Sequence, residues 1–152
     1  MSALSDEQVI LEAARLVQEG RSVTLRVYGR SMLPFIVGGR DSVVLARTGM
    51  LRKGDIVLAR TDEGIYVLHR ILHLALERVV LMGDGNLRKR EVCRPEDVLA
   101  RAVARIGADG RRRQLDTAGQ RLAARLWRWL LPLRRGLLYL YRNLFLRNTP
   151  IR

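Results

Sequence analysis

Residues 23–34 read Val-Thr-Leu-Arg-Val-Tyr-Gly-Arg-Ser-Met-Leu-Pro, an alternating apolar run that ends in a glycine turn. Apolar residues occupy every second position from Val23 to Val27, which is typical of a strand that buries one of its faces. Gly29 lets the backbone turn sharply after this strand, so that Ser31 projects from the strand end. The stretch therefore predicts a β-strand that presents a serine at its exit.

Further short runs, each apolar or alternating, follow along the chain. Glycine and aspartate residues separate them, as in Gly83-Asp84-Gly85-Asn86. Together with the first strand they predict a mainly β fold, a small, curled, mostly antiparallel and barrel-like sheet. The runs cover residues 42–46, 55–60, 65–74, 78–82 and 98–106.

A helix is expected before the first strand. Ser5 and Gln8 have the spacing of a capping box, and Gly20 is a typical stop for a helix. The apolar residues between these signals share one helical face, so the pattern predicts a helix over residues 6–19. They are Val9, Ile10, Ala13, Leu16 and Val17.

The last part of the chain has a different pattern, in which leucines recur at spacings of four and three with arginines between them. Asp116 or Thr117 can cap a helix here, and Pro132 should kink that helix or split it in two. We therefore expect three parts: a helix over residues 1–20, a β domain over 21–110 and a basic helical tail over 111–152. The leucines are Leu122, Leu126, Leu130, Leu133, Leu137, Leu140 and Leu144.

Most of the net charge of +13 lies in this tail, which holds eleven arginines and a single acid, Asp116. Leucines and aromatic residues beside arginines are typical of a helix at an anionic membrane surface. The same stripe could instead pack on the β domain or on a partner protein, so residues 117–147 leave these three options open. Nucleic acid is not expected as a partner, because a phosphate-binding face rarely needs a continuous leucine stripe. The pattern does not indicate an oligomeric state.

The sequence also bears on the cellular compartment. No stretch approaches the roughly 20 apolar residues that span a bilayer, and the first residues lack the pattern of a secretory signal. Cys93 is the single cysteine, which excludes an internal disulfide and fits a reducing compartment. We expect a cytoplasmic protein, with peripheral attachment to the inner face of a membrane as an option.

Two residues could carry chemistry. A serine is a weak nucleophile that needs a base and donors for the developing oxyanion, and the N–H of Ser31 is one candidate donor. His69, within an apolar run, is the candidate base, although such a histidine is more often structural. His73 on the same strand suggests a metal site, but two histidines without a third ligand at a recognised spacing make a poor site. No metal and no cofactor is expected.

Asp84 lies in the Gly83-Asp84-Gly85-Asn86 segment and has two interpretations. Its residue types tolerate the backbone angles of a tight turn, so the segment could serve the fold alone. Alternatively, Asp84 is a carboxylate at a strand end that orients His69.

Taken in order, Ser31-Met32-x-Pro34, Gly54-Asp55-Ile56-Val57, His69-Arg70 and Gly83-Asp84-x-Asn86 are more specific than any one of them. This series resembles the motifs of type I signal peptidases and the related self-cleaving repressor peptidases. The archaeal and endoplasmic-reticulum-type branch, in which a histidine replaces the bacterial lysine base, is the more similar one. The resemblance covers about residues 23–106.

The resemblance implies a role for each matching residue. Ser31 matches the nucleophile, His69 the general base, and Asp84 the acid that would hold the imidazole tautomer and stabilise its cation. Met32 and Pro34 match positions that shape the substrate groove.

The chain also departs from the family pattern. Gly39-Arg40-Asp41 stands where the family usually has Gly-Asp. An acid expected several residues after Gly-Asp-x-Asn is missing at its usual spacing, and Glu91 or Asp97 could replace it. A soluble amphipathic helix occupies the place of the family's membrane anchor.

We therefore expect a serine endopeptidase that cleaves peptide bonds after small residues in a peptide or protein substrate. One alternative is an inactive peptide-binding module of the same fold, tethered by its basic helix to a membrane or a partner. Another is self-processing, for which Ala118-Gly119 is a candidate bond.

Overall fold

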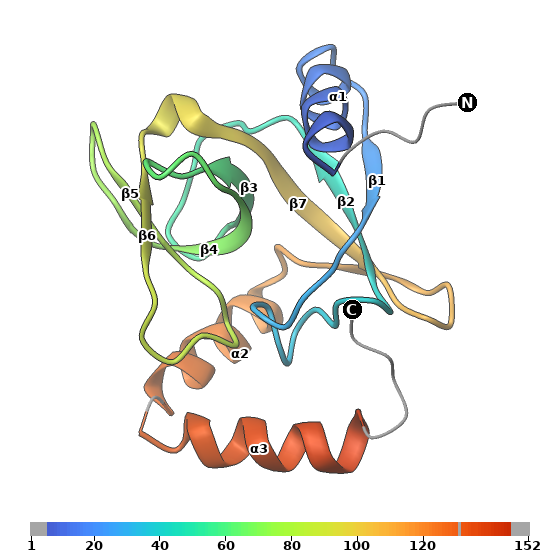
Figure 1. The fold of residues 1–152 in the computed structure, drawn as a ribbon, viewed down its shortest axis with the longest axis vertical. Coiled ribbons are helices and arrows are strands. Elements are labelled where there is room, and N and C mark those ends of the chain that lie inside the picture. Colours follow the sequence, from blue (N-terminus) through green and yellow to red (C-terminus); the bar gives the residue numbers. More distant parts are fainter. Residues whose placement is uncertain (1–5, 131, 147–152) are drawn as a thin grey trace.

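The computed structural model describes residues 6–130 and 132–146, which form an antiparallel sheet with one helix before it and two after it (Figure 1). The helices are α1 (Asp6–Gln18), the 3-10 helix η1 (Pro95–Asp97), α2 (Ala118–Trp129) and α3 (Arg134–Phe145). The strands are β1 (Val23–Arg26), β2 (Ser42–Ala46), β3 (Ile56–Arg60), β4 (Tyr66–Leu74), β5 (Val79–Met82), β6 (Glu91–Cys93), β7 (Val98–Ile106) and β8 (Arg112–Gln114).

The sheet has eight strands in the order β1-β2-β7-β3-β4-β5-β6, with β8 beside β7. The predicted mainly antiparallel β class is confirmed. Each predicted strand is present, and its first and last residues differ from the expected ones by at most one position. The expected closure into a barrel is wrong, because β1 and β6 lie at opposite ends of the order and do not pair with each other. These edge strands have only four and three residues, so they offer few backbone groups for a closing ladder.

Two strands were not expected from the sequence. β6 and β8 have three residues each, too short for an alternating pattern to stand out. All three residues of β8 are exposed, and its pairing with β7 extends the sheet beyond residue 110.

The end of α1 agrees with the sequence. α1 ends at Gln18, and Gly20 follows with a φ of +86°, the left-handed conformation that glycine adopts most readily. The Arg21 N–H donates to the Leu16 carbonyl across this end. The expected cap, Ser5, lies outside the described residues.

The tail forms two helices. The hydroxyl of Thr117 accepts the Gln120 N–H at 3.3 Å and caps α2. Pro132 lies between α2 and α3, so the predicted break is a split, because proline supplies no N–H for a continuous helix. No helix in the described part of the chain has the length and apolar content needed to cross a membrane.

Three core clusters hold these elements together. One lies between α1, the sheet and the segment after β1, and includes Val17, Met32 and Leu45. Another lies on the opposite face of the central strands, around Val57 and Ile71. A third joins the tail to the segment after β1, where Leu138 and Leu146 pack with Leu33 and Val37.

Candidate active site

The segment that carries Ser31 packs directly against the turn after β5. Gly29 has a φ of +84°, and beyond this turn the Ser31 carbonyl accepts the Gly85 N–H at 2.8 Å. A Cβ on Gly83 would lie 2.3 Å from the Ser31 carbonyl oxygen, which is closer than real Cβ atoms come. Glycine is therefore required at Gly83, because its backbone approaches the serine so closely.

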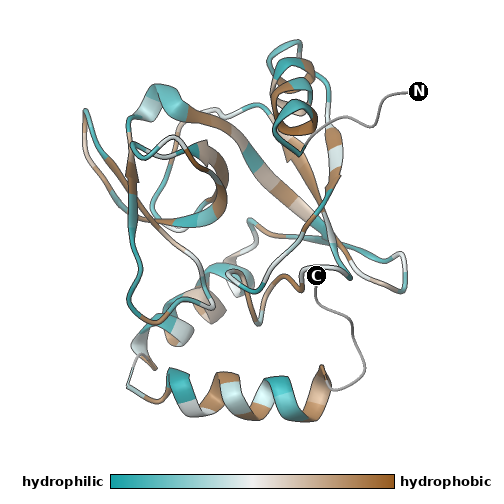
Figure 2. Cartoon of the chain, viewed as in Figure 1, coloured by the Kyte–Doolittle hydropathy of each residue, from teal (hydrophilic) through white to brown (hydrophobic). Residues whose placement is uncertain are grey.

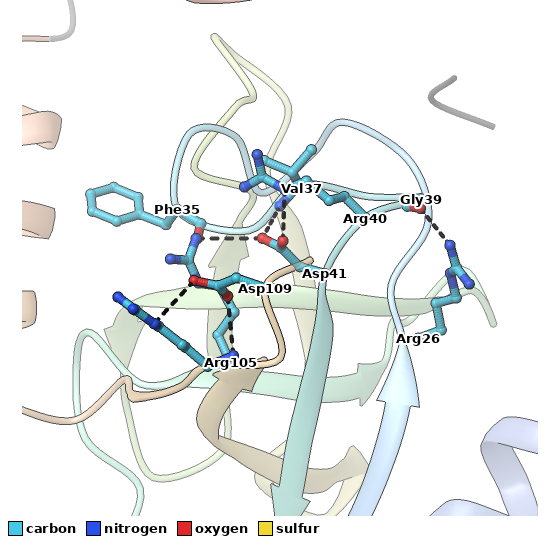
Figure 3. Close-up of polar contacts among 9 residues, drawn as sticks. Arg26, Phe35, Val37, Gly39, Arg40, Asp41, Arg105 and Asp109 are labelled. Atoms are coloured by element: carbon cyan, nitrogen blue, oxygen red, sulfur yellow. Dashed lines mark hydrogen bonds and ion pairs between the residues drawn. The ribbon is translucent and has the colours of Figure 1, made fainter. Parts of the chain in front are cut away.

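Asp41 stabilises the segment that carries Ser31 through hydrogen bonds of its carboxylate. Figure 3 shows its carboxylate pointing toward Val37 and Arg105. The fully buried carboxylate accepts the Val37 N–H at 2.9 Å and the Arg40 Nε–H at 2.9 Å. Arg105 Nη1 lies 3.4 Å from it and donates to the Phe35 carbonyl at 2.7 Å. Asp41, noted in the sequence only as a departure from the family, thus closes the segment on itself.

His69 lies on β4 and is hydrogen-bonded to Glu91 at the start of β6. Their Nδ1 and Oε2 atoms are 2.9 Å apart, and both side chains are only 6% exposed. Since an ionised carboxylate can only accept, Nδ1 donates its proton and the lone pair of Nε2 is left free. Burial lowers the pKa of His69, while the adjacent Glu91 carboxylate opposes this shift. The imidazole is therefore neutral near pH 7.

Arg70, the next residue on β4, forms an ion pair with Asp84. Its Nε and Nη2 donate to the two carboxylate oxygens of Asp84 at 2.8 and 2.7 Å, in a pair that is almost completely buried. A third donor, Nη1, bonds the Gly54 carbonyl at 2.9 Å. Arg70 therefore ties together the turn after β5 and the turn before β3. The acid hydrogen-bonded to His69 is Glu91, whereas both carboxylate oxygens of Asp84 bond Arg70.

The remaining residues that the sequence assigned to the site differ in burial and position. Met32 is 2% exposed within a core cluster, and Pro34 is half-buried. Asp97 is in η1, where it lines a cavity with Arg60 and Asp62. Ser31 is half-buried, and among the described residues no hydrogen bond joins its side chain to His69.

His73, the residue that suggested a metal site in the sequence, is exposed. A register shift between Ile71 and His73 interrupts the alternation of β4, so His73 does not simply repeat the orientation of His69. Within residues 6–130 and 132–146, no group of three histidine, cysteine, aspartate or glutamate side chains is arranged to hold a metal ion.

The tail is fastened to the turn that supports Ser31. Trp127 Nε1 donates to the Asp84 carbonyl at 2.7 Å, and Arg134 Nη1 donates to the Asn86 carbonyl at 3.0 Å. The Phe35 and Trp127 rings meet edge to face at 6.4 Å, with Arg70 over the Phe35 ring and Arg134 over the Trp127 ring. The sequence could not separate Trp127 and Arg134 from the other aromatic and basic residues of the tail.

An apolar cavity of about 350 Å³ lies beside α1. Part of its lining, including Leu25, Val27 and Tyr28, belongs to the segment that leads to Ser31. Another part, Tyr66 and Leu68, belongs to the strand that leads to His69. The cavity therefore borders the chain on the N-terminal side of both residues.

Comparison with known proteins adds a family to this geometry. The family model described as Peptidase S24-like matches residues 2–100. The matched range includes Ser31, the His69–Glu91 pair and the Arg70–Asp84 pair, and it ends before α2 and α3. No curated protein sequence matches the chain.

Proposed function

The chain belongs to the S24-like peptidase family, and on that premise we propose that it is a serine endopeptidase with Ser31 as nucleophile and His69 as base. The observation that carries this assignment is the buried 2.9 Å hydrogen bond between His69 and Glu91. It holds the imidazole in the tautomer whose Nε2 can accept a proton. Glu91 is thus the third member of the proposed triad.

In the proposed reaction, Ser31 Oγ forms a bond to the peptide carbonyl carbon while its proton moves to His69 Nε2. The imidazolium then protonates the leaving amine, and water hydrolyses the acyl-enzyme in the same sequence of steps. Glu91 stabilises the imidazolium in both halves. The Ser31 N–H donates to no other group of the described chain, so it is available for the developing oxyanion.

Asp84 acts in this proposal as a positioning residue. Its carboxylate fixes Arg70, the neighbour of the proposed base, and its turn donates the Gly85 N–H to the Ser31 carbonyl. The turn therefore connects the segment of the nucleophile to the strand of the base. A shift of this turn would change the distance between Ser31 and His69 and would slow the reaction strongly.

The substrate we propose is an extended peptide with small side chains before the cleaved bond, as the resemblance to signal peptidases implies. β1 supports this choice, because it lies at an end of the sheet and no strand of the described residues pairs with its outer edge, where a peptide strand can add. The apolar cavity beside Leu25 and Tyr28 could take alternate side chains of such a strand.

Cleavage of peptides with Ala-x-Ala sites tests the assignment. We expect the wild-type protein to cleave them and Ser31→Ala to lose activity by at least about 10³-fold. Ser22→Ala, at an exposed serine outside the site, is the control and should keep full activity. Equal cleavage by the wild type and Ser31→Ala would reject Ser31 as the nucleophile.

A second candidate function is a peptide-binding module without catalysis. It is favoured by the burial of His69, which is 5% exposed, and by the lack of a hydrogen bond from Ser31 to it in the described chain. Catalytic contacts often form only when substrate binds, so both candidates fit this arrangement. A fluorophosphonate probe that labels Ser31, with labelling lost in His69→Ala, would reject the binding module.

Self-processing at Ala118-Gly119 has less support. These residues form the first turn of α2, whereas a peptide strand added to a sheet must be extended. Cleavage there would require the start of α2 to unwind. We expect the intact mass of the chain, 17.4 kDa, to persist during incubation at raised pH. Accumulation of a fragment ending at Ala118 would contradict this expectation.

A further inference from the structure

A second cavity, of about 560 Å³, lies between the sheet and the two tail helices. It is separate from the apolar cavity beside α1 and has a different character. Basic side chains from the turn before β3, the segment before β6, α2 and α3 converge on it, and no acid among the described residues lines it. These cations are Lys53, Arg90, Arg125, Arg128 and Arg134, with His73 beside them.

The deepest of these cations is not fully satisfied. Arg134 is 1% exposed, and its Nη1 bonds the Asn86 carbonyl, but its Nε is buried without a hydrogen-bond partner. None of the five Lys and Arg residues of the cavity forms an ion pair within the described part of the chain. A buried cation without a counter-charge is costly, so the cavity favours an anion.

The cations also affect one another. The pKa of Arg128 is lowered by burial and by the positive charges of Arg70 and Arg125, with Asp84 opposing. Burial likewise lowers the pKa of Arg134. The Asp84 carboxylate opposes this lowering, and the positive charge of Arg128 adds to it. An anion in the cavity would relieve this repulsion. Guanidinium groups are the side chains best suited to phosphate oxygens, because their planar donors bind two oxygens at once.

Exposed apolar side chains lie on both tail helices, and one of them, Trp129, lines the cavity itself. On α2, the row Arg121, Arg125 and Arg128 lies next to the row Leu122, Leu126 and Trp129, because residues three and four apart share one side of a helix. Trp129 lines the cavity and is 88% exposed, and Leu126 is 56% exposed. Figure 2 shows hydrophobic residues interspersed with hydrophilic ones along α3, and Leu140, Leu144 and Phe145 there are more than half exposed.

We propose that the cavity binds the phosphate headgroup of an anionic phospholipid, while the exposed apolar surface of α2 and α3 lies at the membrane boundary. The net positive tail and the unpaired cations select an anion, and the leucines and Trp129 beside them select one that carries acyl chains. A free phosphate would satisfy the cations but would leave this apolar surface in water. Through Trp127 and Arg134, the same helices would hold the proposed peptidase site at the membrane.

Co-sedimentation with vesicles tests the proposal and does not depend on peptidase activity. We expect the full chain to bind vesicles of phosphatidylcholine containing about one-third phosphatidylglycerol at least about tenfold more tightly than pure phosphatidylcholine vesicles. Arg125→Gln/Arg128→Gln should weaken binding to the anionic vesicles by about tenfold or more. Arg112→Gln/Arg113→Gln, which removes the same charge from exposed β8, should weaken it less than about threefold.

The apolar part has its own matched pair. Trp129→Ser should weaken vesicle binding by about fivefold or more. Leu76→Ser, at a residue that is 99% exposed on the hairpin between β4 and β5, should leave it unchanged. Far-ultraviolet circular dichroism and melting temperature establish that each variant is folded.

Several outcomes would overturn the proposal. These are equal binding to anionic and neutral vesicles, or equal losses for the cavity and β8 double variants. Stabilisation by millimolar inorganic phosphate without vesicle binding would assign the cavity to soluble anions instead. Tighter binding to single-stranded nucleic acid than to anionic vesicles at the same salt would likewise replace the lipid as occupant.

Discussion

Asp84 follows β5 and Glu91 is the first residue of β6, and both buried carboxylates bond side chains of β4. Glu91 accepts a single hydrogen bond from His69, whereas Asp84 accepts two from Arg70. One acid therefore contacts a neutral group that can gain a proton, and the other contacts a cation that keeps its proton at every working pH. The difference supports the proposal that Glu91 orients the base His69 and stabilises its protonated form, whereas Asp84 holds Arg70 and the fold around it.

The orientation of β4 explains this division. His69 and Arg70 are consecutive on a strand, so their side chains point to opposite faces. The pairing of Ile71 with Leu81, and of Leu81 with Glu91, places Glu91 on the face of His69. The pairing of Arg70 with Met82 places Asp84 on the other face.

The largest expected effect is that of replacing Glu91 on kcat. Glu91→Gln should lower kcat on Ala-x-Ala peptides by about 10³–10⁴-fold, because the imidazolium loses its counter-charge and the tautomer is no longer fixed. The melting temperature should change little by comparison. Lys89→Gln is the control, since Lys89 lies 3.7 Å from the other Glu91 oxygen and is 65% exposed. A kcat within tenfold of the wild type would show that Glu91 is not the third member.

Asp84→Asn should act chiefly on stability. Removing one partner of a buried, bidentate pair leaves Arg70 without its counter-charge, and the free energy of unfolding should fall by about 3–5 kcal/mol. Urea denaturation measures this loss. Asp109→Asn, in an exposed ion pair with Arg111, should cost less than about 1 kcal/mol. If Asp84→Asn is no more destabilising than Asp109→Asn, the division between the two acids is wrong.

Neighbouring tryptophans of α2 test whether the tail supports the site. Trp127→Phe leaves the Asp84 carbonyl without its donor and should lower the free energy of unfolding by about 1–2 kcal/mol. Trp129→Phe, at an 88% exposed side chain, should change it by less than about 0.5 kcal/mol. Equal effects of the two changes in thermal denaturation would argue against a tail that holds the turn.

The smallest expected effect is in the pH dependence. Burial lowers the pKa of His69, so the folded site keeps the neutral base to a pH below the usual 6.5. We expect the acidic limb of kcat/KM, where His69 becomes protonated, to be centred below pH 6.5. An acidic limb centred above pH 6.5 would contradict the shift. Replacement of Lys89 should move the limb only slightly towards higher pH, because burial is the main cause of the lowered pKa of His69 and Lys89 contributes least.

The sequence alone was sufficient for most of the strand and helix pattern. Alternation and turn residues marked β1 to β5 and β7, and leucine spacing with Pro132 marked a helical tail that is kinked or split at the proline. These features depend on local periodicity and backbone preferences, which are legible in a few consecutive residues. The short strands β6 and β8 were missed, because they exist only through pairing with longer neighbours.

The candidate site was legible in part. The motif order pointed to Ser31, His69 and Asp84, and Glu91 was an alternative that spacing could not rank. The buried partners Asp41, Trp127 and Arg134 were not expected at all, since each meets groups distant in the sequence or takes a role that its own neighbours do not reveal.

What the sequence by itself determined is thus the mainly antiparallel class, the element order and the ordered motifs of the family. Only the tertiary structure decided that the sheet stays open, that Glu91 rather than Asp84 bonds His69, and that the tail packs on the turn beneath Ser31. The physical reason is register. A one-residue step along β4 changes the face on which a side chain lies, and pairing between distant strands sets which acid it meets there.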